Sequence, residues 1–373
     1  MYNDLVFDSA NGCATLMTIM KVIALFALLP RAATFSMKTS LFRINLTSLS
    51  RRSLSTRDTV SYGRISWDGE VNVKLKEAYQ NAASYLKDNG VPEPDISARM
   101  IVCDVTKIGY RMSDFNNNQD IVLSQSQLTQ LTEYCQLRKD RTPLQYVIGN
   151  WDFYGFTVLC KPPVLIPRPE TEELVEKILA EGFIQKLGRP SRILDVGAGT
   201  GVIGIALLSQ LPTGTCDALD INDVAVALAN DNANLVLKQS SQRYQCKLQS
   251  FIDFAKSGDG AGCYDIIVSN PPYIPTEDME GLEPEVVKFE DRVALDGGLD
   301  GLDMVRDLIL NSWTLLNPSG SRELWIEVSN THPAVIEKWM QTAGPHSDDF
   351  DFIEGITDFA GNPRFVRLRG KLK

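Results

Sequence analysis

The spacing of apolar residues changes along the chain, and the change divides it into two regions. Between residue 71 and about residue 141, apolar residues recur every three or four positions, which is the spacing of one face of an α-helix. We therefore expect helices over residues 75–86, 95–107 and 124–139, the last of which begins at a capping serine, Ser124. Together they predict a small helical bundle over residues 70–142.

From about residue 189 onward, short apolar runs alternate with helical stretches. The expected strands are residues 192–196, 216–221, 245–249, 265–269, 323–328 and 365–368. The expected helices are residues 202–208, 224–237, 302–316 and 334–340. This alternation predicts an α/β domain with a mostly parallel sheet, helices on both faces, and ligands bound beyond the carboxyl ends of the strands. Residues 143–170, in which aromatic residues stand among glycine and prolines, are typical of a hairpin linker.

The first 60 residues differ in composition from the rest of the chain. Residues 9–57 contain no Asp or Glu but seven Lys and Arg, together with frequent Ser and Thr. This composition is typical of an organelle-targeting presequence, which we expect to be disordered over residues 1–60 and to direct the protein to the mitochondrion, with the plastid as the alternative. A basic disordered arm without a targeting role is the alternative. The longest apolar run, residues 22–29, is far shorter than the ~18 residues that cross a bilayer, so we expect no membrane span.

Charge and metal-ligating residues narrow the classes of function. The net charge is −10, from 37 basic and 47 acidic residues, so the chain has no general attraction to phosphate backbones. Its seven Cys contain no C-x-x-C pair and it has only two His, His332 and His346, which we interpret as surface or turn residues. We therefore expect neither a metal site nor a histidine-based catalytic triad.

A glycine-rich loop, Gly197-Ala198-Gly199-Thr200-Gly201, follows the expected strand 192–196 and opens the next helix. Its G-x-G-x-G spacing differs from the G-x-G-x-x-G of dinucleotide folds, and it lacks the Lys-Ser/Thr of a P-loop. Without Cβ atoms, its backbone can approach a ligand closely. Asp195 could receive an ammonium group, and Asp220, which ends the next strand, could accept both hydroxyls of a ribose. A tight turn beside a solvated aspartate is the alternative for this motif alone.

A second motif, Asn270-Pro271-Pro272-Tyr273, comes directly after the expected strand 265–269. Two consecutive prolines stop a strand and fix the chain that leaves it. An amide nitrogen is a poor nucleophile, so a site that methylates one should hold its two hydrogens on acceptors such as the Asn270 side-chain oxygen and the Pro271 backbone oxygen. Tyr273 could wall the planar group. The rate would then come from orientation and polarisation rather than from a strong base. An ordinary strand-ending turn is the alternative.

From about residue 71 to its end, the sequence resembles the HemK/PrmC family of S-adenosylmethionine-dependent glutamine N5-methyltransferases, which modify the Gly-Gly-Gln motif of peptide-chain release factors. Residues 143–149 and 164–172 also match the family, and residues 278–280 and 332–333 resemble its mitochondrial branch. The resemblance implies a Rossmann-like, seven-stranded methyltransferase domain over residues 171–373, joined by the hairpin linker to an N-terminal helical domain that docks the protein substrate.

The resemblance also implies a set of functional residues. S-adenosylmethionine would be held by Asp195, Gly197, Ala198, Gly199, Thr200, Gly201, Asp220, Ile221, Phe251 and Asn270. The glutamine amide would be held by the catalytic residues Asn270, Pro271, Pro272 and Tyr273, in a site shaped by Arg168 and Glu170. Phe251 is placed by an alignment in which the family's acidic residue near the adenine is missing. The implied partner is a class 1 release factor, and we expect a monomer that binds no nucleic acid directly.

Two further functions remain compatible with the motifs. The Asn-Pro-Pro-Tyr turn suits any planar NH₂ group, so an adenine N6-methyltransferase acting on nucleic acid is one alternative. A non-catalytic assembly factor with the same fold is the other. The acidic segment 275–291, which follows the turn, is either a solvated loop or a cover that meets the site or a basic partner.

Overall fold

The computed structural model describes residues 72–184, 187–342 and 349–371, so the presequence expected over residues 1–60 lies outside the described residues. The first described region is helical and consists of α2 (Leu75–Asp88), α3 (Pro94–Thr106), α4 (Met112–Asn117) and α5 (Gln125–Lys139). The three predicted helices are confirmed, and the short α4 is an addition. Ser124 caps α5 as predicted, since its hydroxyl accepts a hydrogen bond from the Gln127 backbone N–H. Within the described ranges, no helix is both long and apolar enough to span a bilayer.

A short helix and a hairpin follow. They are α6 (Leu144–Ile148), β1 (Asn150–Phe153) and β2 (Phe156–Leu159), so the predicted hairpin is confirmed and the helix before it was missed. Asn232 of α9 (Asp223–Leu237) connects the hairpin to the next domain. Its side-chain oxygen accepts from the Leu159 N–H (2.7 Å), while its NH₂ donates to the carbonyls of Leu159 (3.2 Å) and Thr200 (2.9 Å). One buried amide thus ties the hairpin to the glycine loop.

Seven strands form the main sheet in the order β5-β4-β3-β6-β7-β9-β8. Their bounds are β3 (Arg192–Val196), β4 (Thr215–Asp220), β5 (Tyr244–Leu248), β6 (Ile266–Ser269), β7 (Glu323–Glu327), β8 (Phe350–Thr357) and β9 (Pro363–Gly370). The first five strands in that order are parallel, and β9 runs antiparallel to both β7 and β8. All six strands predicted from the apolar pattern are present, and the seven-stranded α/β fold is confirmed. β8 was not among the predicted strands.

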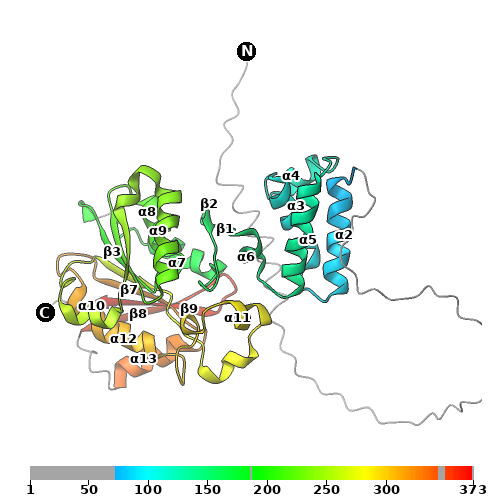
Figure 1. Ribbon diagram of the computed structural model, residues 1–373. Coiled ribbons are helices and arrows are strands. Elements are labelled where there is room, and N and C mark those ends of the chain that lie inside the picture. Colours follow the sequence, from blue (N-terminus) through cyan, green and yellow to red (C-terminus); the bar gives the residue numbers. More distant parts are fainter. Residues whose placement is uncertain (1–71, 185–186, 343–348, 372–373) are drawn as a thin grey trace, which may run out of the picture. The chain divides into compact units, whose positions relative to one another are not determined.

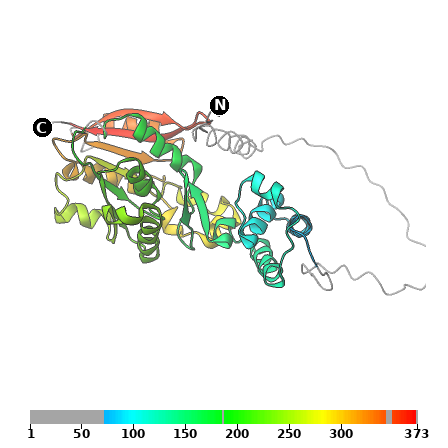
Figure 2. The ribbon, with the colours of Figure 1, turned by 90° about the horizontal axis from the view of Figure 1, so that it is seen from above.

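Helices cover both faces of this sheet (Figures 1 and 2). One face packs against α7 (Pro169–Ala180), α8 (Val202–Gln210) and α9, and the other against α10 (Phe251–Ser257), α12 (Asp303–Ser312) and α13 (His332–Thr342). Along β7, Leu324 and Ile326 belong to the core with α12, whereas Trp325 belongs to the core with α8. Because successive side chains of a strand point to opposite faces, a sheet covered on both faces needs the continuous apolar runs seen in the sequence.

The remaining helical segments lie in connections. They are α11 (Pro284–Phe289) and the 3₁₀ turns η2 (Lys238–Arg243), η3 (Thr276–Gly281), η4 (Arg292–Ala294) and η5 (Trp313–Leu315). Of the two interpretations of His332, as a surface or a turn residue, the first is wrong, because its side chain is buried at the start of α13. Its ring lies where a Cβ on Gly301 would come within 2.9 Å of His332 Cε1, and burial lowers the pKa of the imidazole. His346 lies outside the described residues.

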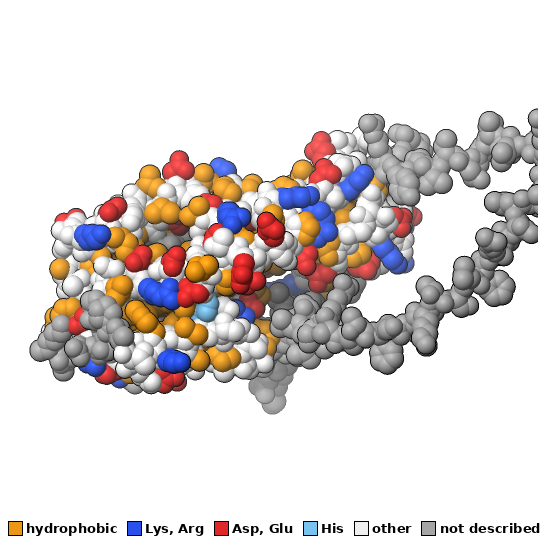
Figure 3. Space-filling view, turned by 90° about the horizontal axis from the view of Figure 1, so that it is seen from below, with side chains coloured by type: hydrophobic (Ala, Val, Ile, Leu, Met, Phe, Trp, Pro, Cys, Tyr) orange, Lys and Arg blue, Asp and Glu red, His pale blue; other side chains and the backbone are white. Residues whose placement is uncertain are grey.

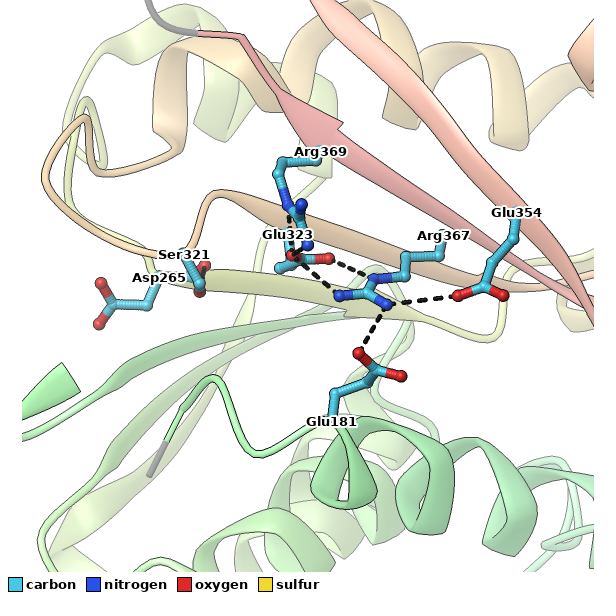
Figure 4. Close-up of polar contacts among 7 residues, drawn as sticks. All are labelled: Glu181, Asp265, Ser321, Glu323, Glu354, Arg367 and Arg369. Atoms are coloured by element: carbon cyan, nitrogen blue, oxygen red, sulfur yellow. Dashed lines mark hydrogen bonds and ion pairs between the residues drawn. The ribbon is translucent and has the colours of Figure 1, made fainter. Parts of the chain in front are cut away.

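A charge network with a buried centre, Glu323 and Arg367, joins the antiparallel end of the sheet to its parallel part (Figure 4). Arg367 of β9 donates from Nε to Glu323 of β7 (2.8 Å), and Arg369 donates to the other oxygen of the same carboxylate (2.8 Å). Glu181 and Glu354 also accept from Arg367, whose guanidinium lies 5.1 Å from the centre of the Trp325 ring. Since Glu323 is almost fully buried, its charge depends on these two arginines, and removing either of them would leave the carboxylate only partly compensated in the interior.

Candidate active site

The predicted motifs meet at one edge of the sheet. β3 lies between β4 and β6, and Val196 is paired with Leu219 on one side and with Ser269 on the other. The residues that follow these strands therefore leave the sheet side by side. The strand order also reverses between β3 and β6, which is where open α/β sheets form a ligand crevice beyond the strand ends. The structure thus brings the glycine loop, Asp220 and Asn270 together.

The glycine loop folds back over β4 and leaves open backbone on its outer side. The N–H groups of Gly197 and Ala198 both donate to the Leu219 carbonyl, at 2.9 and 3.0 Å. Gly197 and Gly199 have φ values of +71° and +54°, which favour glycine. A Cβ on Gly199 would meet no atom within 4 Å, and a Cβ on Gly197 would meet only the Asn270 carbonyl oxygen, at 4.0 Å. This part of the loop could hold a ligand through its backbone.

The other members of the loop face inward. Ala198 and Thr200 are buried, so they can offer a ligand little beyond backbone groups. A Cβ on Gly201 would come within 2.8 Å of the Tyr244 hydroxyl oxygen and 3.1 Å of Ala229 Cβ. Gly201 therefore allows close packing of α8 onto its neighbours rather than access for a ligand.

Asp220 is fixed toward the loop. Its Oδ2 accepts from the Gly199 N–H (2.9 Å) and its Oδ1 from the Asn222 N–H (2.9 Å). Burial raises the pKa of this carboxyl group, and hydrogen bonds from the backbone N–H groups of Asn222, Gly199 and Ile221 oppose that rise. Each carboxylate oxygen has a second lone pair, so Asp220 can still accept hydrogen bonds from a ligand's hydroxyl groups.

Two exposed apolar side chains stand beside Asp220. Ile221 is 62% exposed and Leu248, which is paired with Asp220 across β4 and β5, is 59% exposed. Phe251, in contrast, is 3% exposed and packs in the core with Val196 and Leu219. The structure therefore places Leu248 on this surface and Phe251 beneath it. The sequence signal for Leu248 was an apolar residue at the end of a strand next to the one that ends in Asp220.

Asp195 carries an unpartnered buried oxygen. Its side chain is fully buried, and its Oδ2 accepts from the Gly204 N–H at 3.0 Å. Its Oδ1 has no hydrogen-bond partner among the described residues. Burial raises the pKa of this carboxyl group to about 7. A buried acceptor without a partner is costly, and a ligand that donates a hydrogen bond or carries a positive charge would satisfy it.

Asn270 is held through its side chain by a chain of hydrogen bonds. Its Nδ2 donates to Thr171 Oγ1 of α7 (3.1 Å), and the Thr171 hydroxyl donates to Glu327 Oε2 (2.8 Å). The Tyr273 hydroxyl donates to Glu327 Oε1 (3.3 Å). Glu327 ends β7 next to Asn270, because Ser269 and Ile326 are paired. The resemblance implied that the turn of residues 168–171, which includes Thr171, lies near the site, but it gave Thr171 no role. Glu327 was not predicted, although an acid that ends an apolar strand at this edge was a signal.

Burial dominates the electrostatics of this chain. Glu327 is fully buried, and burial raises the pKa of its carboxyl group to about 7, while the bonds from Thr171 and Tyr273 oppose the rise. The pKa of Tyr273 is raised as well, first by burial and then by the neighbouring Glu327 charge. Neither group is placed to act as a strong base toward a ligand, because each is already bonded within the protein.

The backbone of the turn is clamped by the segment that follows it. The Ile274 N–H donates to the Leu295 carbonyl (2.9 Å), and the Gly297 N–H donates to the Ile274 carbonyl (2.8 Å). A Cβ on Gly297 would lie 2.8 Å from the Pro272 carbonyl oxygen, and one on Gly301 would overlap the Tyr273 carbonyl oxygen. The two glycines therefore allow the chain to press directly onto the Pro-Pro-Tyr backbone.

The acidic segment 275–291 returns to the linker. Arg168 donates to both oxygens of the buried Glu290 (2.8 Å each), and the Asp291 N–H donates to the Pro163 carbonyl (2.8 Å). Asp291 also accepts from the Asn222 side chain (2.8 Å), beside Asp220. Arg168 thus anchors the end of this segment. Glu170 lies in the first turn of α7, next to Thr171.

Comparison with known proteins identifies the family. Residues 77–149 match the family model of the PrmC N-terminal domain, and residues 158–285 match that of the methyltransferase small domain. The chain is 36% identical over 289 residues to the MTRF1L release factor glutamine methyltransferase of Homo sapiens. The aligned residues make up 76% of this chain and 84% of that protein. It is 30% identical over 298 residues to a release factor glutamine methyltransferase of Fusobacterium nucleatum subsp. nucleatum, covering 80% of this chain and 79% of that protein.

Among solved structures, a ribosomal protein L11 methylase of Lactobacillus delbrueckii subsp. bulgaricus is 19% identical in sequence, with a TM-score of 0.37. The match covers 57% of this chain and 83% of the methylase chain. The sequence similarity, in contrast, extends over both the N-terminal helices and the sheet domain. The chain belongs to the family of release factor glutamine methyltransferases.

Proposed function

We propose that this protein transfers a methyl group from S-adenosylmethionine to the side-chain amide nitrogen (N5) of the glutamine in the Gly-Gly-Gln motif of an organellar class 1 release factor. The observation that carries the proposal is the placement of Asn270. Its carboxamide is fixed directly after β6, the strand next to β3 and its glycine loop, and its backbone carbonyl oxygen lies 4.0 Å from the Cβ position of Gly197. Relatives over most of the chain are named for this reaction.

The residues at the strand edge fit S-adenosylmethionine. The open backbone at Gly197 and Gly199 would pass beside it, and Asp220 would accept its ribose hydroxyls. The unpartnered Oδ1 of Asp195 suits its positive ammonium group. Ile221 would line the adenine, and we propose Leu248 in place of Phe251 as the second apolar contact. When bound, the cofactor supplies an electrophilic methyl group on a sulfonium sulfur.

The protein's part in the reaction is to orient a weak nucleophile. The Asn270 side-chain oxygen and the Pro271 carbonyl would accept the two hydrogens of the glutamine NH₂ group, so that its nitrogen can face the cofactor. Tyr273 would pack along the planar amide while its hydroxyl stays bonded to Glu327. Two acceptors placed in advance lower the barrier by orientation and by polarising the amide, without a strong base.

The test compares substrates on the purified full-length protein. Labelled S-adenosylmethionine is supplied with a release factor, with the same factor carrying Gln→Ala in its Gly-Gly-Gln motif, or with nucleic acid. We expect label only on the unaltered factor, with mass spectrometry locating the methyl group on the glutamine side chain. Asn270→Ala should abolish transfer while calorimetry still detects cofactor binding. Label on nucleic acid alone, or equal transfer by Asn270→Ala, would contradict the proposal.

A nucleic-acid substrate finds less support on the surface. On the face drawn in Figure 3, Lys and Arg side chains are interspersed with Asp and Glu side chains. Binding to a phosphate backbone gains most from a continuous basic surface. Together with the net charge of −10, this mixed surface favours a protein substrate.

Compartment, substrate docking and assembly state complete the proposal. The acid-free, basic composition of residues 9–57 supports import into the mitochondrion, with the plastid as the alternative. A fluorescent fusion of residues 1–60 should enter that organelle, and cytosolic fluorescence would refute the assignment. We propose that the N-terminal helices, residues 70–142, dock the release factor and that the protein acts as a monomer, which light scattering of the full chain would check.

A further inference from the structure

We propose that Thr171 and Glu327 form a hydrogen-bond relay that fixes which way the Asn270 carboxamide faces, with its oxygen toward the substrate glutamine. Both would be positioning residues for methyl transfer, acting through Asn270 without touching the substrate. The inference rests on the proposed function and adds to it the origin of the site's preference for an NH₂ group.

The direction of each hydrogen bond follows from the donors available. An ionised carboxylate has no hydrogen to donate, so the single hydroxyl hydrogen of Thr171 is directed to Glu327 Oε2, 2.8 Å away. Thr171 Oγ1 then offers only lone pairs to the Asn270 side chain, 3.1 Å away. The atom facing Thr171 must therefore be the Asn270 NH₂ group. The chemistry of the relay fixes an amide orientation that atomic positions alone leave ambiguous.

The side-chain oxygen of Asn270 is the atom through which the relay affects the substrate. With Nδ2 bonded to Thr171, Asn270 Oδ1 points away from the relay and accepts no hydrogen bond from any described residue. It is free to accept one from a glutamine NH₂. A flipped amide would place two acceptors against each other at Thr171 and two donors against each other at the substrate. The relay therefore selects an amide nitrogen over a carboxylate at the acceptor position.

Glu327 is surrounded by groups from three elements. Thr171 and Glu170 face it from α7, Tyr273 from the turn after β6, and Arg364 from β9. Burial raises the pKa of its carboxyl group to about 7, the Glu170 charge adds to the rise, and Arg364 opposes it. A protonated Glu327 could donate a hydrogen bond to Thr171, and the Thr171 hydroxyl hydrogen would then be free to point to Asn270 instead. As the pH falls below about 7, the relay would therefore no longer fix the orientation of the Asn270 amide.

Thr171→Val tests the relay directly, because it removes the hydroxyl and keeps the shape of the side chain. We expect kcat to fall by about 10- to 100-fold, as for the loss of one aligned polar contact, with cofactor affinity within about 2-fold of the wild type. The wild type should bind a Gly-Gly-Gln release factor at least about tenfold more tightly than its Gly-Gly-Glu variant, and Thr171→Val should bring this ratio close to one. Thr171→Ser, which keeps the hydroxyl, should restore both values.

Glu327→Gln provides a second test with a matched control. The variant removes the titrating group, so the decline of kcat below pH 7 in the wild type should disappear. Glu323→Gln makes the same change in another buried glutamate of β7, four residues and about 13 Å away. It should lower the melting temperature but leave kcat, its pH profile and the Gln-to-Glu binding ratio unchanged.

The outcomes distinguish a failure of the proposed function from a failure of the relay. A wild-type protein that binds the cofactor but does not methylate the release factor would refute the proposed function, and the relay with it. An active wild type with unchanged kcat and binding ratio in Thr171→Val would refute the relay alone. So would an unchanged pH profile in Glu327→Gln, which decides the question if Thr171→Val does not fold. Loss of kcat that Thr171→Ser restores, together with the altered binding ratio, supports the relay.

Discussion

Replacing Gly297 by alanine should displace the backbone of the catalytic turn without altering the side chain of any residue that binds a ligand. The backbone of Gly297 has no positive φ that would exclude alanine, so the effect of Gly297→Ala is steric. The added Cβ would lie 2.7 Å from the Gly301 carbonyl oxygen and 2.8 Å from the Pro272 carbonyl oxygen. Both neighbours are backbone atoms, and neither can rotate away as the end of a flexible side chain would.

The size of the effect follows from these distances. Ordinary Cβ contacts begin at 3.4 Å, so the two carbonyls must retreat by about 0.6 to 0.7 Å. A misplacement of 1 Å at an active site costs roughly 100-fold in rate, which scales to about 10- to 30-fold here. Overpacking should also cost about 1–3 kcal/mol of folding stability, or roughly 2–6 °C in melting temperature.

The assay is steady-state methylation of the release factor, with cofactor affinity measured by calorimetry. We expect Gly297→Ala to lower kcat by the stated factor and to leave cofactor affinity within about 2-fold, because the atoms nearest to the added Cβ belong to Gly301 and Pro272 and not to the glycine loop. Gly281→Ala is the matched control, since it lies in the same connection, has no positive φ and would meet no atom within 4 Å. A folded Gly297→Ala protein with the rate of Gly281→Ala would refute the steric argument.

Three further results are expected. Glu323→Ala should lower the free energy of unfolding by about 1–3 kcal/mol in urea titrations, because Arg367 loses its buried partner and keeps only the half-exposed Glu181 and Glu354; an unchanged free energy of unfolding would contradict this. Asp220→Ala should weaken cofactor binding by about 10- to 100-fold in calorimetry, and unchanged affinity would exclude Asp220 from the site. Burial raises the carboxyl pKa values of Asp195 and Glu327 from ordinary values of 3.8 and 4.5 to about 7. Between pH 4.5 and 7 these two groups therefore bind more protons in the folded state than in the unfolded state. Stability of the cofactor-free protein should then fall as the pH rises from about 4.5 to about 7, and Glu327→Gln should flatten the curve; a rise over that range in the wild type would contradict the argument.

The motifs were predictable because each is marked by residues that are adjacent in the sequence, and because the parallel topology then brings the motifs together. Glycines at 197–201, the acid at 220 and the prolines at 271–272 each mark the end of a strand, and parallel strands bring such ends to one edge. The relay was not predictable in this way. Asn270 and Thr171 are 99 residues apart, and Thr171 and Glu327 are 156 apart. Their contact depends on how α7 packs over the sheet, which no local pattern encodes.

Two misses have the same physical origin. β8 was not predicted because most of its side chains are not buried and its pairing register shifts between Phe352 and Glu354, so its apolar residues do not alternate regularly. His332 was interpreted as a surface or turn residue, but its side chain is buried. Its burial depends on Gly301, a distant glycine that leaves room for the ring. Both features are set by tertiary neighbours rather than by the residues around them in sequence.

The three hydrogen bonds of Asn232 have a consequence for the order of binding. Because one amide holds both Leu159 of the hairpin and Thr200 of the glycine loop, the two segments cannot be ordered independently. A small molecule that stiffens the loop also stiffens the hairpin that leads to the N-terminal helices. Linkage is reciprocal, so a protein partner that binds to those helices would raise the affinity of the site for the small molecule by the same factor by which the small molecule raises the affinity for the partner. Methyl donor and acceptor should therefore bind with positive cooperativity.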